Sequence, residues 1–211
     1  YSDFHKDFTH YEFDEQFTFT KFFEVENDKF KYEADIKRFI KWLRGGYGNN
    51  NTAPFNLFDI KSSLIFVPQT KHQELLLKIF EEDSWFKDNY DVHITNSKIN
   101  DSNRLMVKVN DEFVSKSEKG KIIIAVDQLR TGVTLKQCDT VIFMNDIQSM
   151  DNYIQASFRC QSPMKGKSDC RVIDFLPTRL FTILNDFVLT KQYVSNDSKS
   201  KIIHDFLKCM N

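Results

Sequence analysis

The stretch IIIAVDQLRTGVTLKQCDTVIFMN, residues 122–145, holds two apolar runs on either side of a loop. The runs KIIIAV (121–126) and DTVIFMN (139–145) are continuous rather than alternating, which is typical of strands buried on both faces of a parallel sheet. The loop between them carries carboxylate, basic, hydroxyl and glycine residues. A loop that only connects two strands does not require this set of functional groups. We therefore predict two buried strands and a loop that contacts phosphates.

The same strand-and-helix pattern continues on both sides of this stretch. Further strands are predicted at 63–68, 90–95 and 169–176, and helices at 71–83, 102–115, 150–160 and 178–193. Continuous apolar strands that alternate with amphipathic helices predict an α/β fold, with a parallel sheet covered by helices on both faces. In such a sheet ligands bind in the loops that follow the carboxyl ends of the strands.

The N-terminal segment differs in composition. It is rich in Phe and acidic residues, and its spacing predicts either short strands or an arm packed on a neighbour. A helix is expected next, because Ile36, Phe39, Ile40 and Leu43 share helical spacing before two glycines. We predict an arm, helix and linker at 1–56, the main domain at 57–195, and a tail that can add a short helix at 196–211.

Composition excludes several classes of protein. The 211 residues include 29 basic and 30 acidic side chains, so no global positive field attracts nucleic acid and any such binding must be local. The four cysteines are far apart, which favours free thiols in a reducing compartment, and we expect a cytoplasmic protein with no metal site. No apolar run reaches the roughly 20 residues that span a bilayer, so no membrane partner is expected.

Isolated polar residues are given structural or solvated roles. They are His72, His93 and His204, together with the turn lysines Lys116, Lys119 and Lys121, which we expect to be solvated.

Three motifs, in order, resemble the second, C-terminal RecA-like domain of superfamily 2 helicases and translocases. The resemblance covers roughly residues 61–188. The first motif is SLIFVPQTKHQELLLKIF, a strand, a polar turn and a helix. It is similar to motif IV, whose turn contacts the nucleic-acid backbone, and this implies such a contact for Gln69, Thr70 and Lys71. The resemblance also implies that Ser97, after the next strand, lies near the same backbone.

The second motif is VDQLRTGVT, which resembles motif V. The match covers Asp127, Thr131, Gly132 and Thr134, while Val126 stands where many relatives have a Thr that contacts phosphate. The resemblance implies that Gly132 and Thr134 face the nucleotide and that Asp127 and Thr131 lie near the strand. A glycine allows the backbone to approach a phosphate closely, and hydroxyl groups bind phosphate oxygens without sequence preference.

The third motif is YIQASFRCQSP, which resembles motif VI. Gln155 and Arg159 match, whereas Phe158 replaces a Gly and Ser162 replaces the last Arg. The resemblance implies that Gln155 senses nucleotide and that Arg159 is a finger on the γ-phosphate, a role that suits a permanently charged planar group. On a continuous helix, positions four apart share a face and could reach one site.

A phosphate loop and a D-E-x-x box are missing from the chain. The family carries both on its first RecA-like domain, so the chain, which lacks an initiator Met, is expected to be part of a longer polypeptide. The resemblance implies ATP and Mg²⁺ as cofactors, bound mainly by that first domain, and a nucleic-acid partner, with DNA preferred over RNA because motif VI is similar to that of restriction–modification enzymes and of phage or large-virus proteins. This chain alone is not expected to hydrolyse ATP. The alternative is a non-catalytic RecA-like scaffold or protein-interaction module.

Overall fold

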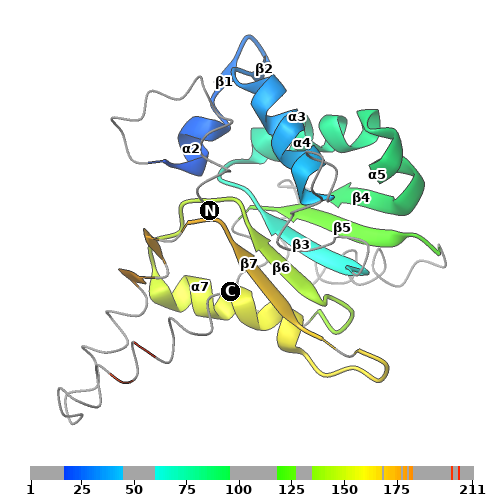
Figure 1. The fold of residues 1–211 in the computed structure, drawn as a ribbon, viewed down its shortest axis with the longest axis vertical. Helices are drawn as coiled ribbons and strands as arrows, with labels where there is room; N and C mark the ends of the chain where they lie inside the picture. Colours follow the sequence, from blue (N-terminus) through cyan, green and yellow to red (C-terminus); the bar gives the residue numbers. More distant parts are fainter. Residues whose placement is uncertain are drawn as a thin grey trace.

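The computed structural model describes residues 17–44, 60–95, 118–126, 135–167, 169–176, 178–179, 181–182, 201 and 204. In this part of the chain, one sheet has five strands in the order β4-β5-β3-β6-β7, and every neighbouring pair is parallel (Figure 1). The strands are β3 (Ser62–Phe66), β4 (Tyr90–Ile94), β5 (Gly120–Ala125), β6 (Thr140–Phe143) and β7 (Arg171–Asp174). After β3 the chain crosses to β4 at one edge of the sheet, and after the neighbouring strand β6 it crosses to β7 at the other edge.

Helices cover both faces of the sheet, as Figure 1 shows. The described helices are α3 (Glu33–Leu43), α4 (Thr70–Glu82), α5 (Ser84–Asn89), α7 (Met150–Ser157) and the 3₁₀ helix η3 (Phe158–Gln161). Successive strand residues point to opposite faces, so Ile65 joins the core under α3 and α4, whereas Leu64 joins the core under α7. The predicted RecA-like parallel sheet with helices on both faces is confirmed.

The N-terminal segment forms a helical turn and a hairpin. They are α2 (Phe19–Phe22), β1 (Val25–Glu26) and β2 (Lys29–Phe30). Asn27 and Asp28 have φ angles of 50° and 61°, which matches the tight turn that suits the twist of a two-residue hairpin. The prediction of short strands from the phenylalanine spacing is therefore wrong at 19–22, where Thr18 accepts a hydrogen bond from the Lys21 amide and caps a helix. The hairpin follows the phenylalanines on which that prediction was based.

The phenylalanines of this segment lie in the core of the chain itself. Phe19, Phe23 and Phe39 are each no more than 1% exposed, and Phe39 packs edge-on against Phe175 with ring centroids 5.1 Å apart. The segment shares one hydrophobic cluster with the sheet, so these side chains are core rather than a platform for stacking bases. The proposed domain limits themselves stay a prediction.

Two details differ from the sequence predictions. The helix predicted at 150–160 ends as an α-helix at Ser157 and continues as η3. Lys121, predicted to be solvated, is only 3% exposed and forms an ion pair with Asp91, its partner on the neighbouring strand β4. The helix predicted at 102–115 lies outside the described residues, as does the tail apart from residues 201 and 204.

Within the described ranges, none of the helices is both long and apolar enough to cross a membrane.

Candidate functional site

The residues matched to motif IV lie where the central strand β3 ends. Gln69 has an extended backbone and precedes α4, and Thr70 and Lys71 form the first turn of that helix. All three side chains are exposed. The first amides of a 13-residue helix have no intrahelical acceptor and carry the positive end of its dipole, so this turn can receive a phosphate oxygen.

Lys71 already has an anionic neighbour. Its Nζ lies 2.7 Å from Oδ1 of Asp28 at the tip of the hairpin, and the Asp28 side chain is 91% exposed. The hydrogen bond from Lys71 lowers the pKa of Asp28. Such an exposed pair is weak, so a backbone phosphate could replace the carboxylate.

A buried amide lies beneath this turn. Gln73 is 1% exposed, and its Nε2 donates to Thr95 Oγ1 at 2.7 Å and to the Ile124 carbonyl at 3.1 Å. These bonds connect α4 to the carboxyl ends of β4 and β5. The position of the helix start is therefore set by the sheet.

The residues matched to motif VI lie on α7 and η3. Ser149 caps α7 by accepting from the Asn152 amide at 3.4 Å, Gln155 is exposed on the helix, and Arg159 is half-buried on η3. The change from α to 3₁₀ geometry after Ser157 means that Gln155 and Arg159 do not share the regular four-residue spacing of one α-helix. The structure thus supplies two neighbouring polar groups but not the continuous helical face that the sequence predicts.

Arg159 lies toward the amino end of β6. Because α7 starts after the carboxyl end of β6 and leads back to the start of β7, it must run opposite to the strands. Burial lowers the pKa of the Arg159 guanidinium, and the nearby Cys138 sulfur, just before β6, opposes that shift. Arg159 therefore lies away from the carboxyl ends of the strands, and its role in binding a ligand stays a prediction.

The segment around Cys138 is fixed to the centre of the sheet. The carboxylate of Asp139 accepts from the amides of Lys61 at 3.1 Å and Ser62 at 3.2 Å, so the starts of β3 and β6 are held together. Burial raises the pKa of Asp139, and these hydrogen bonds oppose that rise. The start of β6, next to Cys138, is therefore held against the start of β3.

Five of the predicted site residues lie outside the described residues: Ser97, Asp127, Thr131, Gly132 and Thr134. The chain becomes described again at Leu135, which is fully buried and accepts a hydrogen bond from the Cys138 amide at 3.2 Å. Of the predicted residues that are described, Gln69 to Lys71 are together at one end of the sheet, and Gln155 and Arg159 are on the helix that leads to the other.

Sequence reasoning missed two polar residues next to the loop between β6 and α7. Asp146 accepts from the amides of Phe19 and Thr20, both at 2.7 Å, and from Thr20 Oγ1 at 2.6 Å. Arg179 is 3% exposed and reaches the same loop from the other side. A charged residue in the otherwise apolar run after β7 was the available signal for Arg179; no sequence signal pairs Asp146 with residues 126 or more positions away.

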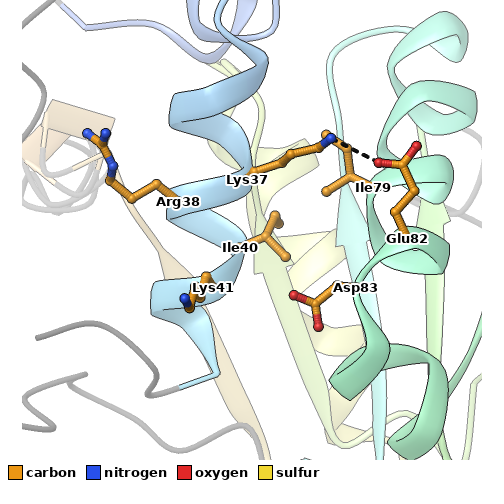
Figure 2. Close-up of a pocket in the computed structure, with 7 residues that line it drawn as sticks. All are labelled: Lys37, Arg38, Ile40, Lys41, Ile79, Glu82 and Asp83. Atoms are coloured by element: carbon orange, nitrogen blue, oxygen red, sulfur yellow. Dashed lines mark hydrogen bonds and ion pairs between the residues drawn. The ribbon is translucent and has the colours of Figure 1, made fainter.

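A groove of about 420 Å³ lies between α3 and α4 (Figure 2). Ile40 and Ile79 form its floor, and Lys37 bridges it through an ion pair of 2.9 Å with Glu82. The groove is lined by charged groups of both signs, and none of them belongs to the predicted motifs. Among the described residues, no group of three His, Cys, Asp or Glu side chains could hold a metal ion.

Comparison with known proteins relates this geometry to a family. The model of the family described as "Helicase conserved C-terminal domain" matches residues 56–162, from before β3 to the end of η3. One curated relative is "Putative type II restriction enzyme and methyltransferase RM.MpnORF110P C-terminus" of Mycoplasma pneumoniae, which is 25% identical over 194 residues. That match covers 82% of this chain and 27% of the relative, so the chain spans about a quarter of the curated protein's length.

Two solved structures are similar. "ATP-dependent Type ISP restriction-modification enzyme LlaBIII bound to DNA" matches with a TM-score of 0.52 and 14% identity, over 72% of this chain and 11% of that one. The C-terminal part of the Fun30 ATPase domain matches with a TM-score of 0.43 and 13% identity, over 85% of this chain and 55% of that one. At 14% identity, the first likeness supports the fold alone.

Proposed function

Because the chain belongs to the helicase conserved C-terminal domain family, as the second RecA-like domain of a superfamily 2 helicase or translocase, we propose that it completes an ATP-dependent motor that moves along DNA. The first RecA-like domain of the same polypeptide would hold ATP and Mg²⁺. This chain, with its main domain at 57–195, would supply the arginine and the strand contacts. Alone it would not hydrolyse ATP, and the complete protein would act in the cytoplasm.

The observation that carries the proposal is the separation of two groups of residues along one rigid sheet. Gln69, Thr70 and Lys71 are exposed at the carboxyl end of β3, and Arg159 is half-buried near the amino end of β6. A motor needs distinct sites for strand and nucleotide within one body, so that closing on ATP moves the strand site. The separate positions of these two groups of residues support the proposal.

At the nucleotide side, Arg159 would stabilise charge on the γ-phosphate, and Gln155, Gly132 and Thr134 would contact the nucleotide. A guanidinium held by packing before ATP arrives needs little reorganisation when negative charge develops on the phosphate oxygens. The half-buried setting of Arg159 beside Cys138 supports such preorganisation.

At the strand side, the start of α4 would contact the sugar-phosphate backbone through Gln69, Thr70 and Lys71. Ser97 and Thr131 would add hydroxyl groups, and Asp127 would orient its loop rather than touch phosphate. Contacts of this kind hold a strand without reading its sequence. DNA is preferred over RNA because one similar protein is described as a restriction enzyme and methyltransferase and another structure is described as bound to DNA.

The test uses the complete polypeptide that carries this chain. Arg159→Ala should lower nucleic-acid-stimulated ATP turnover by about 10³-fold or more, the range found for arginine fingers. DNA binding should stay within a few fold. Arg38→Ala, which removes a partly exposed guanidinium from α3 on the other face, should leave turnover unchanged. Stimulation by DNA should exceed stimulation by RNA of the same sequence.

A scaffold without catalysis is the second candidate, favoured by Phe158 and Ser162 at motif VI positions. It predicts that the complete polypeptide shows no nucleic-acid-stimulated turnover. Normal turnover by Arg159→Ala would reject the arginine's role while leaving the family membership intact.

A further inference from the structure

The loop between β6 and α7 is held from two sides. On one side, the Asp146 carboxylate accepts three hydrogen bonds from the start of α2. On the other side, Arg179 donates from Nη2 to the Asn145 carbonyl at 2.7 Å and from Nη1 to Asn145 Oδ1 at 3.0 Å. A contact from Nη1 to the Ile147 carbonyl measures 3.4 Å. The point at which α7 begins is therefore fixed by residues distant in the sequence.

Arg179 itself is a buried cation that faces a buried carboxylate and two aromatic rings. Its Nε lies 3.0 Å from Oδ2 of Asp174, its Nη2 donates to Oδ1 of the same carboxylate at 3.0 Å, and the two side chains are 2% and 3% exposed. The guanidinium also lies 5.3 Å from the Phe143 ring centroid and 5.6 Å from that of Tyr153. It thus touches β6, α7, the connecting loop and the end of β7 at once.

A buried ion pair is a poor device for stability alone, since desolvation offsets most of the attraction and apolar residues of the same volume often serve as well. What distinguishes this ion pair from an apolar contact is its geometry. A planar guanidinium with several donors fixes the direction of each acceptor, which an apolar side chain cannot do. The burial of Arg179 therefore points to a role in setting geometry.

The geometry is transmitted along α7 to Arg159. Tyr153, one turn into the helix, stacks on Phe143 with ring centroids 4.6 Å apart. The Arg179 guanidinium lies over the Tyr153 ring. Ser157 donates to the Tyr153 carbonyl at 2.8 Å, and the fully buried Cys160 donates to the Ser157 carbonyl at 3.1 Å. Arg159 lies between the exposed Phe158 and the buried Cys160, so its position follows from that of the helix.

We infer that Arg179 is a positioning residue for Arg159: it fixes the start and the rotation of α7, and so sets where the guanidinium on η3 points. The inference rests on the proposed function. It adds a residue beyond the reach of the family match, which ends at residue 162.

The test is a double-mutant cycle in the complete polypeptide, with DNA-stimulated ATP turnover as the readout. Arg179→Met should lower kcat by about 100-fold, the size of effect that a 1 Å misplacement can cause, with the KM for ATP within about threefold because the other domain holds the nucleotide. Arg159→Ala should lower kcat further. The double variant should equal Arg159→Ala, because Arg179 acts only through Arg159.

Arg44→Met is the matched control. Arg44 pairs with Asp83 and lies 5.8 Å from the Trp85 ring centroid, so its loss also removes one ion pair and one cation–π contact, on the other face of the sheet. It should leave kcat unchanged. Arg179→Lys should restore part of the activity, and Asn145→Ala, which removes one acceptor and leaves the Asp174 pair, should lower kcat in the same direction if Arg179→Met does not fold.

The outcomes separate the inference from the proposed function. Normal turnover by Arg159→Ala overturns both. Loss of turnover in Arg159→Ala, together with multiplicative losses in the double variant or an unchanged kcat in Asn145→Ala, overturns the inference alone. Equal kcat values for Arg159→Ala and the double variant, with Arg44→Met unaffected, support it.

Discussion

The two ends of the sheet are held together by different chemistry. At the carboxyl end, the buried pair of Asp174 and Arg179 fixes the loop after β6. At the amino end, the Asp139 carboxylate fixes the starts of β3 and β6 through neutral backbone amides. Removing one partner of an ion pair leaves a buried charge without a counter-charge. A backbone amide that loses its acceptor is uncharged and can bond to water or to another acceptor. The carboxyl end should therefore be the more sensitive of the two.

The largest effect on folding should come from Asp174→Asn. It leaves the Arg179 guanidinium buried without a counter-charge, which costs about 3–5 kcal/mol in the free energy of unfolding. Urea denaturation of the chain would measure it. The double change Asp174→Leu with Arg179→Met should recover most of the loss, and a double variant as unstable as Asp174→Asn would show that the charge balance is not the cause.

The next effect is one of pH and lies beside the start of α4. His72 is 2% exposed, and burial lowers its pKa from 6.5 to about 4. Between these pH values the unfolded chain binds more protons than the folded chain. The free energy of unfolding therefore has its full value above pH 6.5 and decreases as the pH falls toward 4, by about 3 kcal/mol in total. His72→Phe should flatten this part of the pH profile of unfolding; an unchanged slope would contradict the assignment.

A smaller loss is expected at the amino end. Asp139→Ala removes the acceptor of two backbone amides and should cost about 1–3 kcal/mol. The same denaturation experiment measures it beside Asp174→Asn. A loss larger than that of Asp174→Asn would reverse the comparison between the two ends.

The smallest effect on stability should be that of Lys71→Ala, which removes only an exposed pair with Asp28. Unfolding should hardly change. Under the proposed function, the dependence of DNA affinity on salt should lose about one unit of slope on a log–log plot, because one phosphate contact is gone. An unchanged slope would remove Lys71 from the strand site.

Much of this architecture can be read from the sequence, because buried parallel strands are continuous apolar runs and α3 and α4 keep helical spacing. The N-terminal phenylalanines were harder to predict, since alternation in so short a segment suits a strand as well as a helical turn. Lys121 was misassigned because only its partner on the next strand, Asp91, allows a lysine to be buried there.

Site geometry was less predictable than the fold. Motif spacing identifies Arg159 but not the change to a 3₁₀ turn after Ser157, in which Cys160 is buried in the core. The network of Arg179, Asp174 and Asn145 joins residues that the sheet brings together from separate parts of the sequence. Periodicity does not encode such contacts.

The most direct measurement of the central claim compares two ligands of the complete polypeptide, ADP and ADP with aluminium fluoride, in the presence of Mg²⁺ and DNA. A group that acts on the transferred phosphate must favour the transition-state analogue over the product. Arg159→Ala should weaken binding of the aluminium fluoride complex by at least about 100-fold and leave ADP affinity nearly unchanged. Equal affinities of the variant and the natural protein for the aluminium fluoride complex would show that Arg159 does not reach the γ-phosphate.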